Sequence, residues 1–166
     1  MPNEDFTWKD TVPSVLAGGF FIAQMIYGGF FLDHPRIDII KYLGIFVFIL
    51  SGIFGMAPVF IFPKEGGVKK GKSFVHTTKI VDKGIYSIVR HPQYSAFIFW
   101  AFAAMFLFQN LVVVFLGLPV IFLTYYDMMR EDKKNIKKFG DAYKDYMKRV
   151  PRANFFFGLI RLIFKK

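Results

Sequence analysis

Two short segments of this sequence hold the side chains that could do chemistry. Residues 84–94 contribute four of them, namely Tyr86, Arg90, His91 and Tyr94. Residues 125–132 contribute a second set, namely Tyr125, Tyr126, Asp127, Arg130, Glu131 and Asp132. Arginine can bind a carboxylate through two parallel hydrogen bonds, and carboxylates accept hydrogen bonds from ammonium or hydroxyl groups. If folding brings the two segments together, they form a polar pocket with both signs of charge.

The residue inventory excludes several other kinds of site. The chain has no cysteine, which rules out disulfides, thiolate metal sites and cysteine nucleophiles. Its three histidines, His34, His76 and His91, lack the spacing of zinc ligands. No metal site is therefore predicted.

Residues 66–73, Gly-Gly-Val-Lys-Lys-Gly-Lys-Ser, match the phosphate-binding string of P-loop proteins. That motif works only where a buried strand precedes it and a helix follows it within an α/β sheet. Here an apolar span and Pro63 precede it, and the rest of the chain cannot supply such a sheet. We interpret the segment as a flexible basic loop near anionic lipid and not as a nucleotide site.

The composition indicates which elements position the polar segments. Of the 166 residues, 54% are hydrophobic, against about 45–50% in ordinary soluble domains. A mean hydropathy of +0.38 together with a net charge of +10 requires the charges to be separated from the apolar residues. The chain is therefore predicted to form a single all-α integral membrane domain over residues 1–166, with a buried soluble all-α core as the less favoured alternative.

Four apolar stretches are predicted to cross the bilayer as helices. They cover residues 11–32, 39–62, 92–108 and 110–126. About 20 helical residues span a hydrocarbon core of ~30 Å. The first two stretches are long enough to span it, and the last two are short. Because Gln109 and Asn110 are the only polar residues between the two apolar runs, the last two stretches are predicted to form a tight helical hairpin.

The basic residues predict the direction in which the chain crosses the membrane. Of the 22 Lys and Arg residues, seven lie in residues 63–91 and 12 lie in residues 127–166. The positive-inside rule places this loop and this tail on the cytoplasmic side, and four spans bring the N-terminus to the same side.

The predicted hairpin brings its two polar ends to one place. Packed antiparallel helices run about 8–10 Å apart, so Arg90 and His91 should face Glu131 and Asp132 across one small site. Opposite charges at neighbouring helix ends indicate a polar pocket more than they indicate separate membrane anchors.

The tail is predicted to hold an amphipathic helix and not a fifth span. From Asp132 onward, apolar residues recur every three or four positions, and lysines and arginines occupy the other faces. The apolar positions are Ile136, Phe139, Tyr143, Met147 and Val150. Such a helix can lie on the headgroups of a membrane with anionic lipids, or cover the cytoplasmic mouth of the bundle. A second apolar run, residues 155–164, is too short to span and is expected at the same interface.

Three sequence elements, in this order, resemble the isoprenylcysteine carboxyl methyltransferase family, whose wider superfamily includes the phospholipid N-methyltransferases. The first is Gly-x-Tyr-x-x-x-Arg-His-Pro-x-Tyr at residues 84–94, and the second is the acidic pair at residues 131–132. The third is Phe-Gly-x-x-Tyr-x-x-Tyr at residues 139–146, followed by Val-Pro-Arg at residues 150–152. The likeness implies a membrane enzyme that uses S-adenosyl-L-methionine without a Rossmann domain.

The resemblance, which implies His91, Tyr94 and Glu131, and the chemistry of the other side chains together predict the members of the site. The cofactor pocket would contain Tyr86, Arg90, His91, Tyr94, Glu131 and Asp132, with Arg90, Glu131 and Asp132 as the catalytic set. There an arginine would bind the cofactor's carboxylate, acidic residues its ammonium or ribose, and aromatic rings its adenine or sulfonium. The family commonly has a histidine six residues before the motif glycine. Thr78 stands at that position here, with His76 two residues earlier as the candidate replacement.

The expected reaction is methylation of a lipid-embedded substrate at the cytoplasmic interface. Carboxyl O-methylation of an isoprenylcysteine-like substrate is the first choice, because a carboxylate is already nucleophilic. N-methylation of a phosphatidylethanolamine headgroup is the alternative, and it requires a base such as His91 or Asp132. The expected partners are a prenylated or lipid substrate and a bilayer with anionic lipids, with no nucleic acid.

Two further interpretations are less favoured. Sterol and steroid reductases share an Arg-His-Pro-x-Tyr element and use a nicotinamide cofactor, but Phe97 stands where their motif continues with Glu. The other interpretation is a non-enzymatic membrane sensor or transporter subunit. The first two spans carry no charged side chain at mid-membrane that would indicate an ion pathway.

Overall fold

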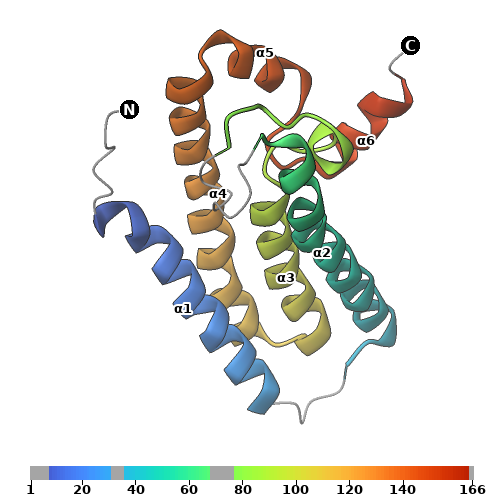
Figure 1. Cartoon of the computed structure of the whole chain (residues 1–166). Coiled ribbons are helices and arrows are strands. Elements are labelled where there is room, and N and C mark those ends of the chain that lie inside the picture. Colours follow the sequence, from blue (N-terminus) through green and yellow to red (C-terminus); the bar gives the residue numbers. More distant parts are fainter. Residues whose placement is uncertain (1–7, 31–35, 68–76, 165–166) are drawn as a thin grey trace. The chain divides into compact units, whose positions relative to one another are not determined.

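The computed structural model describes residues 8–30, 36–67 and 77–164, and within these ranges its secondary structure is helical, without strands. The elements are α1 (Trp8–Phe30), α2 (Asp38–Glu65), the 3-10 helix η2 (Gly84–Ser87), α3 (Pro92–Phe108), α4 (Leu111–Phe139), α5 (Asp141–Arg149) and α6 (Phe155–Ile163) (Figure 1). The all-α prediction is confirmed.

Three of the described helices are long and apolar enough to cross a membrane, namely Thr11–Phe30 within α1, the whole of α2 and the whole of α4. The apolar helix α3 has 17 residues and rises about 26 Å, which is slightly less than the thickness of a hydrocarbon core. Only Gln109 and Asn110 separate α3 from α4, as predicted. The chain is therefore a multi-pass membrane protein.

The helix that contains the predicted fourth span is longer than that span, because α4 continues without a break past Tyr126 to Phe139. Charged side chains begin at Asp127, but charges do not end a helix, and residues 127–139 contain neither proline nor glycine. The helix ends before Gly140, whose φ of 61° costs glycine far less than other residues. The single tail helix expected from Asp132 is therefore divided between α4 and α5.

The chain forms two compact units. The first comprises Met1–Ile49 and Ile98–Asp127, and the second comprises Leu50–Phe97 and Met128–Lys166. In the first unit, Gln24 of α1 is fully buried, and its amide donates to the carbonyls of Ala101 and Val113 at 3.1 Å each. Hydrogen bonds between membrane helices contribute about 0.6 kcal/mol on average, so this side chain helps to hold α1 against α3 and α4.

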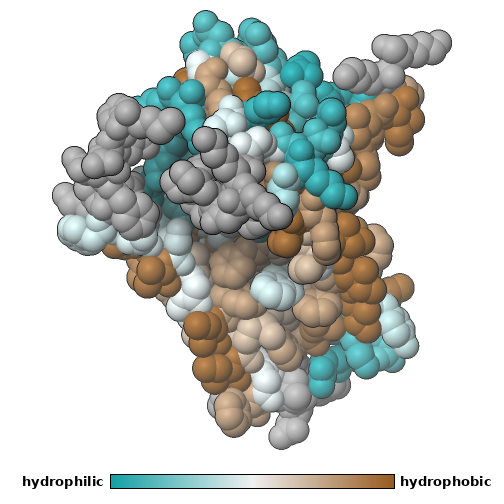
Figure 2. Space-filling view, in the orientation of Figure 1, coloured by the Kyte–Doolittle hydropathy of each residue, from teal (hydrophilic) through white to brown (hydrophobic). Residues whose placement is uncertain are grey.

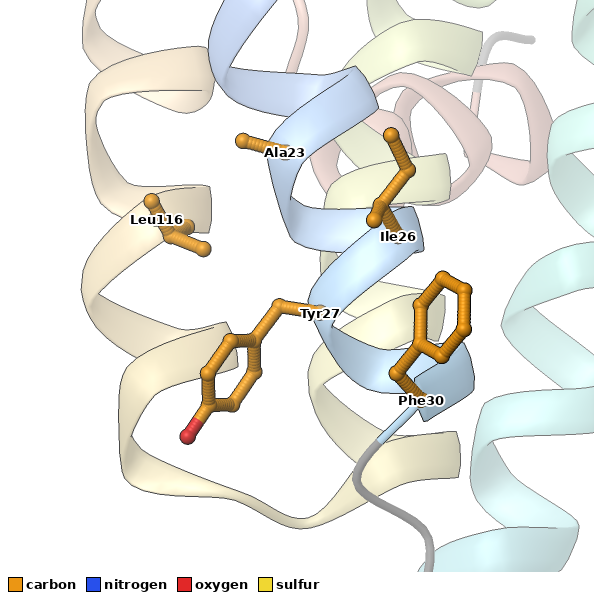
Figure 3. Close-up of a pocket in the computed structure, with 5 residues that line it drawn as sticks. All are labelled: Ala23, Ile26, Tyr27, Phe30 and Leu116. Carbon is orange, nitrogen blue, oxygen red and sulfur yellow. The ribbon is translucent and has the colours of Figure 1, made fainter.

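The first unit also contains an open apolar pocket beside α1. Its lining residues are Ala23, Ile26, Tyr27, Phe30 and Leu116 (Figure 3). None of these side chains is charged, and none belongs to the predicted site. A polar cofactor needs several convergent polar groups, which this lining does not provide.

In the second unit, the apolar face of α5 covers part of the loop between α2 and α3. Tyr143, Tyr146 and Val150 are buried, and the hydrophobic residues packed against them are Ile80, Ile136, Phe139 and Met147. The apolar residues predicted for the tail therefore pack against other residues of the protein. The lysines of α5 remain on its outer side, in the hydrophilic region at the top of Figure 2.

Candidate functional site

The carboxylate of Asp132 on α4 lies at the centre of a buried polar cluster in the second unit. The Arg90 guanidinium donates to both of its oxygens, from Nη2 to Oδ2 at 2.9 Å and from Nε to Oδ1 at 3.4 Å. The two side chains are 6% and 3% exposed. A two-point contact of this kind fixes orientation as well as distance, so it holds the turn before α3 against α4.

Three further side chains contact the same carboxylate. His91 Nε2 lies 2.7 Å from Oδ1, and the Tyr143 hydroxyl donates to Oδ1 at 2.8 Å. Arg152 Nε donates to Oδ2 at 2.8 Å. A buried charge is stable only when it is paired and its lone pairs are hydrogen-bonded, and both conditions hold for Asp132.

The segment after α5 is hydrogen-bonded to the turn that carries Arg90. The Arg90 backbone N–H donates to the Pro151 carbonyl at 3.0 Å, and the His91 N–H donates to the Arg152 carbonyl at 3.3 Å. The Arg90 side chain also donates from Nη1 to the carbonyls of Met147 and Val150. Most donors of this guanidinium are therefore occupied by the protein itself.

Tyr86 of η2 is held by packing and by its backbone. Its ring lies edge-on to Phe62 with the ring centroids 5.2 Å apart, and its carbonyl accepts a hydrogen bond from the Tyr146 hydroxyl at 2.6 Å. Burial raises the pKa of both tyrosine hydroxyls above the ordinary value. Both phenols therefore stay neutral at physiological pH, and Tyr146 remains a hydrogen-bond donor.

The other predicted members of the site are more accessible. Tyr94 is partly exposed, and its ring lies edge-on to His91 with the centroids 5.8 Å apart. Glu131 is also partly exposed, and it forms no hydrogen bond or ion pair with another residue of the described ranges. Within the acidic pair, the carboxylate of Asp132 is thus bonded to other side chains of the protein, and Glu131 is the carboxylate that a ligand can reach.

Three further residues of the second segment, Tyr125, Tyr126 and Asp127, belong to the first unit. Tyr125 and Tyr126 are 42% and 48% exposed, and Asp127 accepts a hydrogen bond from Ser14 within the first unit at 2.6 Å. His76 lies outside the described residues. Thr78, the other candidate for the family histidine, donates to the Gly67 carbonyl at 3.1 Å.

Two members of the cluster, Tyr143 and Arg152, are absent from the predicted site. The signal for them was the spacing in Tyr-x-x-Tyr and in Val-Pro-Arg. Helical periodicity assigned Tyr143 to the apolar face of the tail, and that assignment is also right, because its ring packs with Tyr146 while its hydroxyl reaches Asp132. A tyrosine can serve both environments at once.

The chemistry available to this arrangement is the binding and orientation of a polar ligand. In the part of the chain that the structure describes, no three His, Asp or Glu side chains are grouped closely enough to hold a metal ion. The site instead offers one partly exposed carboxylate, that of Glu131, and an aromatic and imidazole pair, Tyr94 and His91, where α3 begins.

Part of this chain matches a known protein family. Residues 70–137 match the isoprenylcysteine carboxyl methyltransferase (ICMT) family. This stretch contains every residue predicted for the site, from His76 to Asp132. Over this stretch the chain is similar to the ICMT family.

Curated proteins similar to this chain carry names of one kind. This chain is 33% identical over 93 residues to the protein-S-isoprenylcysteine O-methyltransferase of Schizosaccharomyces pombe. The aligned part makes up 51% of this chain and 39% of the relative. Protein-S-isoprenylcysteine O-methyltransferase B of Arabidopsis thaliana is 29% identical over 100 residues, covering 55% of this chain and 51% of its own. The match therefore spans about half or less of these curated relatives. No solved structure shows a significant match.

The substitution Asp132→Asn should lower the stability of this protein far more than Asp145→Asn. The first substitution leaves two guanidinium groups facing a neutral amide, and breaking a buried pair costs about 3–5 kcal/mol. The second removes only an exposed partner of Lys148. Unfolding of the purified protein in detergent measures both, and equal shifts would contradict the central role of Asp132.

Proposed function

We propose that this chain is an S-adenosyl-L-methionine-dependent membrane methyltransferase that methylates the carboxyl group of an isoprenylcysteine-like substrate at the cytoplasmic interface. The family match over residues 70–137 and the names of the relatives support this assignment. The observation that carries it is the contact of Arg90 and His91 with Asp132. This contact joins the Arg-His-Pro turn and the acidic pair, both inside the matched segment, into one site.

The proposed reaction depends mainly on how the protein positions the methyl donor and the substrate. When bound, S-adenosyl-L-methionine supplies a methyl group on positively charged sulfur, and a substrate carboxylate can accept that group without losing a proton. The protein's residues must therefore hold two reactants in line and exclude water. Such positioning is worth up to about 7–11 kcal/mol when the geometry is favourable.

Glu131 fits the cationic part of this cofactor. Its carboxylate is partly exposed and without a partner in the described ranges, and a negative charge near an ammonium or sulfonium is favourable. We assign His91 and Tyr94 to the same pocket, because their rings are in edge contact where α3 begins and His91 contacts Asp132, the neighbour of Glu131. Aromatic faces attract cations.

Arg90 and Asp132 receive positioning roles in this scheme. Arg90 was expected to bind the carboxylate of the cofactor, but its donors contact Asp132 and two backbone carbonyls. Releasing them for a ligand would leave a buried carboxylate with fewer partners, which is costly. The pair therefore holds the turn and α4 together so that Glu131 and His91 lie in one pocket.

The membrane arrangement that suits this reaction has four spans, with α3 as the fourth in addition to the three longer helices. The positive-inside rule then places the loop 63–91, the tail and both termini in the cytoplasm. The polar cofactor would arrive from the cytosol while the prenyl chain stays in lipid. The exposed lysines of α4 and α5 would face anionic headgroups.

Phosphatidylethanolamine N-methylation is the second candidate, and one observation favours it. His91 Nε2 lies 2.7 Å from the Asp132 carboxylate. An ammonium group must lose a proton before it can accept a methyl group, and an imidazole held by a carboxylate is a suitable base. Carboxyl methylation remains the first choice because the curated relatives are all named for it.

The chemical stability of the product distinguishes the two acceptors. Purified protein in vesicles is incubated with methyl-labelled S-adenosyl-L-methionine and with either a farnesylcysteine analogue or phosphatidylethanolamine. We expect label that is released by mild base, because the product of carboxyl methylation is an ester. Base-stable label in the phospholipid fraction would contradict carboxyl methylation and favour the amine.

Glu131→Gln tests the cofactor pocket without disturbing the fold. We expect the affinity for S-adenosyl-L-methionine to fall by more than about tenfold, with an unchanged melting temperature, because Glu131 has no partner in the described structure. Titration calorimetry in detergent measures the affinity. Glu65→Gln, which removes an exposed partner of Lys83, is the control and should bind normally. Normal binding by both variants would refute the assignment of Glu131.

A further inference from the structure

The helix α6 and the residue after it present large apolar side chains on their outer side. Phe156, Phe157, Ile160, Ile163 and Phe164 are between 53% and 78% exposed. They belong to the hydrophobic area at the upper right of Figure 2, where α6 lies. A contiguous exposed patch of this kind marks a contact with lipid or with another protein.

The inner side of α6 is joined to α2 and to the loop that leads into α3. The Phe155 ring lies edge-on to Phe54 of α2 with the centroids 5.3 Å apart. Gly158 faces the Ile88 carbonyl so closely that any side chain would overlap it. Arg161 donates from Nη2 to the Ser87 carbonyl at 2.8 Å. The only charged side chain of α6 is therefore turned toward the protein and away from the apolar outer side.

The contact with Phe54 indicates the depth at which α6 begins. Phe54 precedes the end of α2 at Glu65 by about 16 Å of helix, and half of a hydrocarbon core is about 15 Å. Other residues of this part of α2, such as Ile53 and Phe60, are 53% and 63% exposed, as expected of a lipid-facing surface. The first turn of α6 thus packs on a membrane-spanning helix well inside its apolar stretch.

We propose that α6 is a bilayer-inserting helix whose outer side lies in the hydrocarbon beneath the headgroups. Its nine residues rise about 14 Å, too little to cross the membrane, so it enters and leaves on one side. Its inner contacts with Ser87 and Ile88 link this insertion to the loop that carries Arg90 and His91. The partner is the acyl-chain layer of the membrane and not a second copy or a soluble protein. This role does not depend on the proposed methyl transfer.

The chain has no native cysteine, so single-cysteine variants report depth without background. Nitroxide labels are placed at Phe156→Cys and Ile160→Cys, with Lys148→Cys on the exposed side of α5 as the control. In phosphatidylcholine and phosphatidylserine vesicles, collisions with oxygen and with a water-soluble nickel chelate are compared. We expect both α6 labels to lose nickel accessibility and keep oxygen accessibility, while the control label stays nickel-accessible.

Two outcomes would overturn insertion. One is nickel accessibility of the α6 labels equal to that of the control, which means that they lie in water. The other is an immobilised label shielded from both reagents, which means that protein covers this side.

Amide hydrogen exchange in the same vesicles tests the contact between α6 and the loop that carries Arg90 and His91. We expect Arg161→Ala to make the Ile88 and Val89 amides exchange roughly tenfold faster, because the hydrogen bond to the Ser87 carbonyl is lost. Arg149→Ala, which removes only an exposed contact with Asp82, is the matched control. Arg161→Lys keeps a donor and should restore part of the protection. Equal exchange in Arg161→Ala and Arg149→Ala would overturn the link, whatever the protein's activity.

Discussion

The Asp132 carboxylate holds together three parts of the chain that are far apart in sequence. Arg90 and His91 reach it from the turn before α3, Tyr143 reaches it from α5, and Arg152 reaches it from the segment beyond. In a buried setting these contacts depend on one another, because each cation or donor removed leaves the remaining charges less well compensated. The turn, α4 and the tail therefore form one rigid frame only while this carboxylate is present.

The same frame explains why an acidic pair is useful at this place. Adjacent residues on a helix point about 100° apart, so Glu131 and Asp132 cannot both face the same interior. Asp132 is buried against Arg90, and Glu131 is left partly exposed. One carboxylate thus fixes the geometry and its neighbour is presented to a ligand. For a reaction that needs positioning more than covalent help from the protein, this division is sufficient.

Much of the architecture could be predicted, because apolar runs in a membrane protein have few alternatives to helices. The hairpin and the meeting of Arg90 with Asp132 followed from a two-residue connection. The end of α4 could not be read from the charges, since helices continue into water, and Gly140 was the better signal. The sequence also could not show whether Arg90 binds a carboxylate of the protein or one of a ligand, because a guanidinium binds both in the same way.

The central role of the Asp132 carboxylate is tested most directly by a double-mutant cycle between Arg90 and Asp132. The free energy of unfolding in detergent is measured for Arg90→Gln, Asp132→Asn and the double variant. If the contact is direct and buried, the double variant should lose less stability than the sum of the two single losses. The difference, the coupling energy, should be about 1–3 kcal/mol. Additive losses, with a coupling energy near zero, would mean that Arg90 does not hold Asp132 in the membrane protein, and the frame described above would be wrong.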